Sequence, residues 1–220
     1  MYRLAVLLSG RGSNFEAILS AIKDGFIKKG EIVLVLSDNK DARGLKIAKE
    51  NGIDALFLDP KEKSREDYDI GVVKILKNHK IDFVLLAGYM RILSPYFVKS
   101  FKNRILNIHP ALLPSFRGLH AQRQAVEKGV KFSGATVHFV TESLDDGPII
   151  IQSVVPVYND DSEESLSRRI LKTEHKIYPL AVKLLTENRL KIDNGKVVVD
   201  WEEPEEFFIT NPKVGGENGI

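Results

Sequence analysis

The stretch Arg104-Ile-Leu-Asn-Ile-His-Pro-Ala-Leu-Leu-Pro-Ser115 begins with a short apolar strand that ends at a proline. Residues two apart in a strand point to the same side, so we expect Asn107 and His109 to face one way. Pro110 lacks a backbone N–H and forces its predecessor to be extended, which ends the strand pairing there. An amide and an imidazole are thus expected together at a strand end. They could polarise a carbonyl and transfer a proton, or they could simply close local hydrogen bonds.

Upstream of this stretch, apolar runs alternate with helical patterns. The expected strands are 4–8, 32–36, 54–58 and 82–87, and the expected helices are 15–22, 42–51, 64–79 and 94–101. Short, continuous apolar runs separated by helices are typical of parallel strands that are buried on both faces. The pattern predicts a sheet with right-handed crossovers, in which the stretch above is the fifth strand.

Downstream, the same alternation continues with less regularity. A helix is expected over 120–128, strands over 136–140 and 149–157, and a long helix over 160–188. Pro156 marks the second of these strands as an edge or a strand end. Pro179 should kink the long helix or split it in two. Asn194-Gly195 predicts the turn of a β-hairpin over 190–199.

The predicted fold is therefore α/β. It is a single, doubly wound, mostly parallel sheet flanked by helices, with a C-terminal hairpin. One domain is expected over residues 1–200, and residues 201–220 are expected to form a loosely ordered C-terminal tail, because they are acidic and then rich in glycine.

Composition narrows the class of protein. The chain has 220 residues, 43% of them hydrophobic and 28% charged, as is ordinary for a globular protein. The net charge of +2 is too small to indicate a nucleic-acid or membrane surface. The absence of cysteine excludes disulfides, thiolate metal ligands and a cysteine nucleophile. We expect a cytoplasmic protein, because neither a signal peptide nor a transmembrane-length apolar run is recognisable.

A glycine-rich turn, Ser9-Gly-Arg-Gly-Ser-Asn14, follows the first strand and precedes a helix. A helix N-terminus offers free N–H groups and a positive dipole end, so this turn could hold an anion. Phe15 stands where a dinucleotide fingerprint has its third glycine, and the Gly-Lys-Ser/Thr of a triphosphate loop is absent. A phosphate monoester fits better than either. The alternative is a plain turn that Ser13 or Asn14 caps.

Two further features point to a ligand. Gly88-Tyr-Met-Arg-Ile-Leu93 follows a strongly apolar strand, and open α/β sheets bind ligands at the carboxyl ends of their strands. A turn that plugs the core is the alternative. Arg65 lies in the first turn of a helix, where the dipole prefers an acid; solvent exposure or a ligand carboxylate would explain it. His138 shares a strand face with Thr136, and we expect it to be a satisfied strand histidine.

Four segments together resemble a known family. The turn 9–14, the loop 88–93, the stretch 107–114 and Asp145-Asp-Gly-Pro-Ile-Ile150 have the order and spacing of the phosphoribosylglycinamide formyltransferases, a branch of the folate-dependent formyl transferases. The resemblance covers roughly residues 1–200. The Asn-x-His-Pro and Asp-x-Gly-Pro segments are shared across the wider family, whereas the turn and Glu174-His-x-x-Tyr-Pro179 favour this branch.

The resemblance implies formyl transfer from 10-formyltetrahydrofolate to the amine of 5-phosphoribosylglycinamide in de novo purine biosynthesis, without a metal. It implies three catalytic residues: Asn107, His109 and Asp145. The acceptor would be held by Gly12, Ser13, Asn14 and Glu174. The folate would be bound by Arg65, Met90, Arg91, Ile92, Leu93 and Asn107.

The chain also departs from the family pattern. Arg117-Gly118 stands where many relatives have Pro-Gly or Lys-Gly, and the tail beyond Trp201 is not explained. Methionyl-tRNA formyltransferase and formyltetrahydrofolate hydrolase are less fitting relatives, since each carries an additional domain. A non-catalytic ribonucleotide-binding or folate-binding module is a further alternative. The expected partners are small-molecule substrates, with neither nucleic acid nor membrane, and a homodimer is left open.

Overall fold

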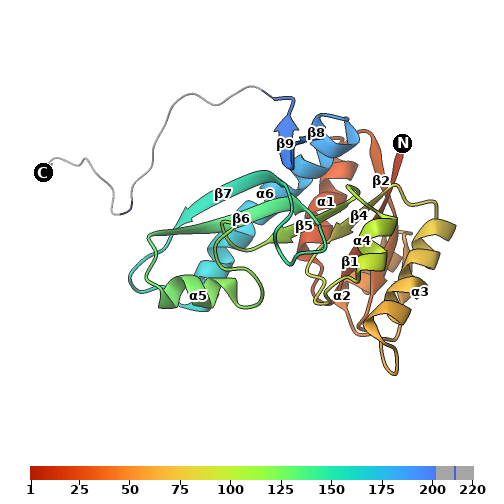
Figure 1. The fold of residues 1–220 in the computed structure, drawn as a ribbon, viewed down its shortest axis with the longest axis horizontal. Coiled ribbons are helices and arrows are strands. Elements are labelled where there is room, and N and C mark those ends of the chain that lie inside the picture. Colours follow the sequence, from red (N-terminus) through yellow and green to blue (C-terminus); the bar gives the residue numbers. More distant parts are fainter. Residues whose placement is uncertain (202–210, 212–220) are drawn as a thin grey trace, which may run out of the picture.

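The computed structural model describes residues 1–201 and 211, which form a sheet with helices packed on both faces (Figure 1). The predicted tail, 201–220, therefore lies outside the described residues apart from Trp201 and Asn211. The Asn211 side-chain amide donates to the backbone carbonyls of Lys131 (2.7 Å) and Val157 (2.9 Å).

Within the described residues, seven strands form the main sheet in the order β3-β2-β1-β4-β5-β6-β7. The strands from β3 to β5 are parallel, and β6 and β7 are antiparallel to their neighbours. Their bounds are β1 Tyr2–Leu8, β2 Gly30–Ser37, β3 Asp54–Phe57, β4 Phe83–Leu86, β5 Ile105–His109, β6 Phe132–Phe139 and β7 Ile149–Pro156. The mostly parallel, doubly wound sheet that the sequence predicts is confirmed. β7 lies at an edge, as Pro156 indicates.

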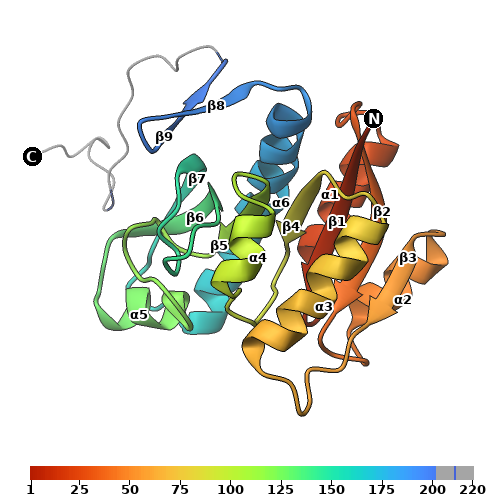
Figure 2. The same ribbon diagram turned by 45° about the vertical axis from the view of Figure 1, so that its right-hand side comes forward.

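Two layers of helices cover the sheet, as Figure 2 shows, with α3 and α4 on one face and α1, α2, α5 and α6 on the other. Their bounds are α1 Ser13–Lys23, α2 Arg43–Glu50, α3 Arg65–Asn78, α4 Pro95–Ser100, α5 Ala121–Glu127 and α6 Glu163–Thr186. Strand β1 serves both layers because its side chains alternate. Leu4, Val6 and Leu8 enter one apolar cluster, while Ala5 and Leu7 enter the other.

The long helix α6 is one continuous element of 24 residues with Pro179 inside it, so a split at this proline is wrong. Proline removes one backbone hydrogen bond and costs about 3 kcal/mol in a helix interior. The residues around it oppose that cost: Tyr178, Ala181 and Val182 are fully buried against the sheet, and each large buried apolar side chain contributes about 1.5–3 kcal/mol. The Tyr178 hydroxyl also donates to the carbonyl of Leu86 at the end of β4 (2.9 Å).

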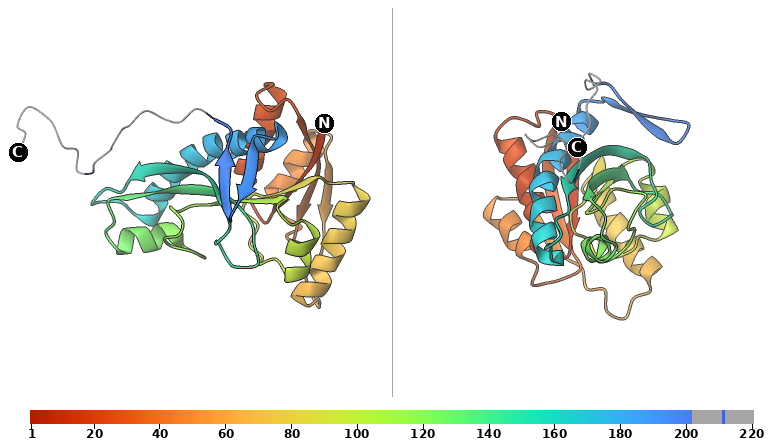
Figure 3. Two further views of the ribbon diagram at one scale, coloured as in Figure 1. Left: turned by 45° about the horizontal axis from the view of Figure 1, so that its top comes forward. Right: turned by 90° about the vertical axis from the view of Figure 1, so that its left-hand side faces the viewer.

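The predicted C-terminal hairpin is confirmed as β8 Leu190–Asp193 and β9 Lys196–Val199, which form a separate two-stranded ribbon beside the main sheet (Figure 3). Asn194 (φ 47°) and Gly195 (φ 76°) both adopt the left-handed conformation. A two-residue hairpin turn of this kind requires it, and Asn-Gly accommodates it best. Among the described residues, no helix is both long and apolar enough to cross a membrane.

Candidate active site

Two cavities lie at the carboxyl ends of β1, β4 and β5. The first has a volume of about 100 Å³ and is bounded by the loop after β4, the end of β5 and residues 140–145. The second has a volume of about 610 Å³ and lies between the glycine-rich turn after β1 and the N-terminal half of α6. The carboxyl ends of strands are where open α/β sheets bind ligands.

The two cavities share two stretches of backbone, whose neighbouring residues line one cavity or the other. On β5, Asn107 lines the first cavity and Ile108 lines the second. On the loop after β4, Arg91 lines the first and Met90 lines the second. On β5 this follows from the alternation of side chains along a strand. A group bound in one cavity could therefore react with a group bound in the other at the end of β5.

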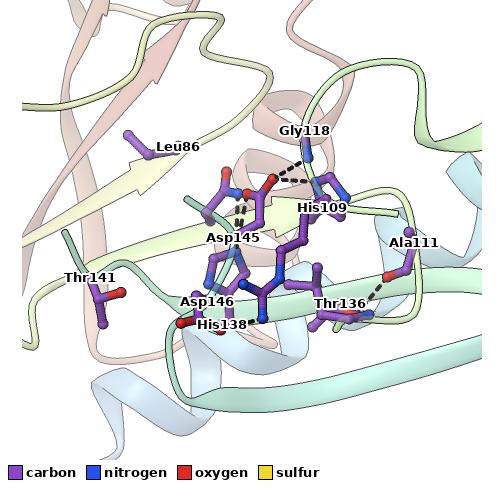
Figure 4. A network of polar contacts seen from close by, with 12 residues as sticks. Leu86, His109, Ala111, Gly118, Thr136, His138, Thr141, Asp145 and Asp146 are labelled. Carbon is purple, nitrogen blue, oxygen red and sulfur yellow. Dashed lines mark hydrogen bonds and ion pairs between the residues drawn. The ribbon is translucent and has the colours of Figure 1, made fainter. Parts of the chain in front are cut away.

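His109 lies at that end of β5 and is 5% exposed. Its Nε2 lies 2.8 Å from the carbonyl oxygen of Phe116. Its Nδ1 lies 3.4 Å from Oδ2 of Asp145, as Figure 4 shows for the His109–Asp145 pair. Both partners are hydrogen-bond acceptors, so a ring that carries a hydrogen on each nitrogen satisfies both of them. The same Asp145 oxygen accepts a hydrogen bond from the Gly118 amide (2.8 Å).

Asn107 and His138 form a second pair beside this one. The amide nitrogen of Asn107 lies 3.2 Å from Nε2 of His138, and Nδ1 of His138 lies 2.9 Å from the carbonyl of Phe139. Burial lowers the pKa of the His138 imidazole from its ordinary value. A neutral ring donates from Nδ1 to the carbonyl and accepts at Nε2 from Asn107. His138 is thus a satisfied strand histidine, as expected.

The loop after His109 is held from the next strands of the sheet. The Thr136 hydroxyl donates to the carbonyl of Ala111 (2.7 Å) and accepts from the backbone N–H of Leu113 (3.1 Å); Figure 4 shows Thr136 beside Ala111. The Gln152 amide nitrogen donates to Thr136 Oγ1 (3.0 Å) and to the Leu113 carbonyl (2.9 Å). These bonds fix the chain immediately beyond Pro110, so the direction in which β5 ends is set by β6 and β7.

The glycine-rich turn forms the floor of the second cavity. Gly12 has φ 78° and is the N-cap of α1, and no side chain caps the helix there. Neither Ser13 nor Asn14 therefore makes the capping bond that the alternative interpretation of this turn requires. A Cβ on residue 12 would lie 2.9 Å from the Cα of Gly44, so glycine is needed for this close approach as well. The uncapped N-terminus of an 11-residue helix faces the cavity.

Asn14 and Glu174 meet at the side of the same cavity. The Asn14 amide nitrogen donates to Glu174 Oε2 at 2.7 Å, and both side chains are more than nine-tenths buried. Burial raises the pKa of the Glu174 carboxyl, and the bond from Asn14 partly opposes this rise. The Asn14 amide oxygen is buried and has no protein partner among the described residues. A bound hydroxyl group could supply a donor to it.

The residues expected to meet the folate are divided between several places. Arg91 and Leu93 line the first cavity together with Ile92, and the Arg91 guanidinium stacks on the Tyr68 ring at 4.4 Å. Met90 is 66% exposed and lines the second cavity instead. Arg65 is exposed at the first position of α3, and it does not line either cavity. Within the part of the chain that the structure describes, no group of three or more His, Cys, Asp or Glu could hold a metal.

The sequence profile of the family described as "Formyl transferase" matches residues 2–182, which is most of the chain. The chain belongs to the formyl transferase family.

Two relatives illustrate how this formyl transferase compares in length. Phosphoribosylglycinamide formyltransferase of Escherichia coli (strain K12) is 44% identical over 200 residues, which cover 90% of this chain and 94% of that protein. The trifunctional purine biosynthetic protein adenosine-3 of Drosophila pseudoobscura pseudoobscura is 46% identical over 193 residues. Those residues cover 86% of this chain but only 14% of that much longer protein.

A solved structure shares the fold of this formyl transferase. The crystal structure of glycinamide ribonucleotide transformylase 1 from Symbiobacterium toebii superposes with a TM-score of 0.88 at 50% sequence identity. The similarity covers 90% of this chain and 94% of that one.

The structure of this formyl transferase brings together Asn107, His109 and Asp145, which lie 38 residues apart at most in the sequence. It also contains site groups that sequence reasoning did not single out. These are the carbonyl of Phe116 and the amide of Gly118. Both are backbone groups, so the residue types at these positions do not indicate the contacts. Gln122 and Arg168 line the second cavity and were not anticipated either. Their exposure is ordinary for polar residues, so no pattern marked them.

Proposed function

We propose that this formyl transferase moves a formyl group from 10-formyltetrahydrofolate to the amine of 5-phosphoribosylglycinamide, in de novo purine biosynthesis. The observation that carries the proposal is the pair of cavities beside the end of β5, where Asn107 and Asp145 line the first cavity and His109 lies 3.4 Å from Asp145. The relatives named as phosphoribosylglycinamide formyltransferase support the choice of acceptor, since the matched residues span 94% of the Escherichia coli protein.

The second cavity suits the acceptor. Its uncapped helix N-terminus at Gly12, Ser13 and Asn14 offers backbone N–H groups and a positive dipole end to a phosphate. Beside it, Glu174 and the unpartnered amide oxygen of Asn14 can accept hydrogen bonds from ribose hydroxyls. The cavity of about 610 Å³ is large enough for a ribonucleotide.

The first cavity suits the folate. Leu86, Leu93 and Val140 supply apolar surface. Polar residues also line this cavity: Arg91, Asn107 and Asp145. A flat, hydrogen-bonding ring system matches such a lining. Its enclosed part is only about 100 Å³, so the rest of the folate extends outward past Ile92, which is 54% exposed. We assign Arg65 to the outer, carboxylate-bearing end.

The reaction then takes place at the end of β5. The acceptor amine attacks the formyl carbon, a C–N bond forms, and the carbonyl electron pair moves to oxygen. The amide of Asn107 donates to that oxyanion, and a protonated His109 donates to it from Nε2 after this N–H has turned away from the Phe116 carbonyl. Losing one such donor typically costs about 3–4 kcal/mol of barrier. Asp145, whose Oδ2 lies 3.4 Å from His109 Nδ1, orients the imidazole and helps to relay the proton from the amine to the departing folate nitrogen. The bond to that nitrogen breaks, giving the formylated acceptor and tetrahydrofolate.

An assay with both substrates tests the proposal directly. Purified protein is incubated with 5-phosphoribosylglycinamide and a 10-formyl folate, and the release of deformylated folate is followed by absorbance. We expect release that depends on the acceptor and saturates with it. Release without the acceptor would indicate a hydrolase, and bound folate without any release would indicate a binding module.

A further inference from the structure

Three consecutive residues after β5 contact His109, Asp145 or the residue next to Asp145. They are Phe116, Arg117 and Gly118. The Phe116 carbonyl lies 2.8 Å from His109 Nε2. The Gly118 amide donates to Asp145 Oδ2 at 2.8 Å. Between them, the Arg117 guanidinium forms an ion pair and hydrogen bond with the carboxylate of Asp146. We call residues 116–118 the clamp segment.

The backbone of the clamp segment needs support to keep this shape. Phe116 has φ 54° and Gly118 has φ 79°, so two of its three residues are left-handed. That conformation is unfavourable for a residue with a side chain such as Phe116. The two backbone contacts to His109 and Asp145 therefore persist only where other contacts hold the segment in place.

The bond between Arg117 and Asp146 supplies such a contact from outside the site. It joins two loops that are 29 residues apart in the sequence, one following β5 and the other preceding β7. Asp146 directly follows Asp145, which is itself left-handed at φ 47°. The bond thus fastens the loop of the carboxylate to the loop whose carbonyl and amide touch His109 and Asp145.

We propose that Arg117 is a positioning residue for formyl transfer, which acts through Asp146 to hold the clamp segment against His109 and Asp145. The inference rests on the proposed function for its kinetic test. Arg117 lines neither of the two cavities. Its effect is to fix the distance and direction between the imidazole and the carboxylate.

The exposure of the Arg117–Asp146 ion pair distinguishes a role in positioning the catalytic residues from a role in global stability. The side chains of Arg117 and Asp146 are 42% and 46% exposed. Ion pairs at such exposure contribute little to global stability. Catalysis is far more sensitive, since a displacement of about 1 Å at the reacting groups can lower the rate roughly 100-fold. Loss of the pair should therefore lower kcat while leaving the melting temperature almost unchanged.

The test compares Arg117→Gln, Asp146→Asn and the double variant with Arg117→Lys. The matched control is Glu31→Gln, because the Arg3–Glu31 pair has similar exposure (40% and 47%) and lies at the opposite end of β1 and β2. We expect each neutral variant to lose about tenfold in kcat with KM nearly unchanged, the double variant to lose no more than either single one, and Arg117→Lys to recover most of the loss. Glu31→Gln should keep wild-type kinetics.

Hydrogen exchange of the Gly118 amide provides a readout independent of turnover. This amide donates to Asp145 in the clamp, so its exchange should accelerate in Arg117→Gln and stay slow in Glu31→Gln. Unchanged exchange, or unchanged kcat in Arg117→Gln beside an active wild type, would overturn the inference. An inactive wild type would instead overturn the proposed function. The exchange measurement would then still show whether Arg117 holds the clamp segment in place.

Discussion

The side-chain amide nitrogen of Asn107 lies 3.2 Å from Nε2 of His138, across neighbouring antiparallel strands. His138 is 2% exposed, and its other ring nitrogen is bound to the carbonyl of Phe139. The neutral ring therefore accepts one amide hydrogen of Asn107, which fixes which way this amide points. The second amide hydrogen remains to donate elsewhere, and the first cavity is where Asn107 is exposed.

Replacing Asn107 with Ala should abolish most turnover. The variant removes one of the two proposed oxyanion donors, and we expect kcat to fall about 100- to 1000-fold with KM for the acceptor little changed. Steady-state kinetics at saturating folate would measure both constants.

His138→Phe is the matched variant for this experiment, because it removes the partner of the amide but keeps Asn107 itself. We expect a smaller loss, about tenfold, since the amide can still donate once it has rotated into place. Equal losses in the two variants would contradict the assignment of Asn107 as the direct donor.

Replacing Gly12 with Ala should weaken acceptor binding. Residue 12 is left-handed and lines the second cavity, and an added Cβ would lie 2.9 Å from the Cα of Gly44 in the neighbouring helix. We expect the KM for the phosphorylated acceptor to rise. We also expect the free energy of unfolding to fall by more than the ~1–2 kcal/mol that a left-handed L-residue typically costs. Urea unfolding and acceptor titration would give the two quantities.

The control for this variant is Gly52→Ala. Gly52 has φ 69° but open space around its Cβ position, and it lies past the end of α2. It should show the backbone cost alone, with wild-type KM. If Gly12→Ala kept its acceptor affinity, the phosphate site would have to lie elsewhere.

Parts of the chain with strong local rules could be predicted from the sequence. β5 begins at Ile105 and ends at His109, because Pro110 cannot continue the ladder. The hairpin follows from Asn194-Gly195, which accept left-handed backbone where other residues resist it. In each case one or two residues determine the local conformation regardless of what packs around them.

Other features depend on tertiary contacts and could not be predicted in this way. Pro179 does not split α6, because the packing of its neighbours outweighs the local penalty. Met90 lines the second cavity although Tyr89 and Arg91 on either side of it line the first, because this loop has no regular backbone pattern from which side-chain directions could be inferred. The contacts of the Phe116 carbonyl and the Gly118 amide involve backbone atoms that every residue has.

Replacing Glu174 with Gln should stabilise the protein at alkaline pH. Burial raises the pKa of this carboxyl, so the native state holds its proton more tightly than the unfolded state does. The stability that this group contributes is complete below the unfolded pKa of about 4.3 and is lost as pH rises through the higher native value. The Gln side chain never ionises, and its oxygen can still accept from Asn14.

Urea unfolding of wild type and Glu174→Gln at pH 5 and pH 8 would measure this difference. The free energy of unfolding of the variant, relative to that of the wild type, should be higher at pH 8 than at pH 5. The KM of the variant for the acceptor should rise, because a proposed contact to the ribose is altered. A stability difference that stays constant with pH would show that the carboxyl has the same pKa in both states.

Replacing Asp161 with Asn should destabilise the protein at neutral pH but not in acid. Both oxygens of Asp161 accept from the Arg169 guanidinium, at 2.7 and 2.9 Å, just before and within α6. This hydrogen-bonded pairing holds the pKa of the carboxyl well below its usual range. A depressed acid pKa contributes stability that is present above the unfolded value of about 3.9 and is lost as pH falls towards the native one.

We therefore expect Asp161→Asn to cost about 1.5–3 kcal/mol at pH 7, the usual range for a hydrogen bond to a charged group. The difference should shrink steadily below pH 4, because the Asp161 carboxylate becomes protonated in the unfolded wild-type chain while it stays ionised in the native one. Glu164→Gln is the control, because its pair with Arg168 lies on the same helix but is largely exposed (81% and 66%). Thermal melts from pH 3 to pH 7 should show a difference in melting temperature from the wild type that depends on pH for Asp161→Asn. For Glu164→Gln the difference should be close to zero at every pH.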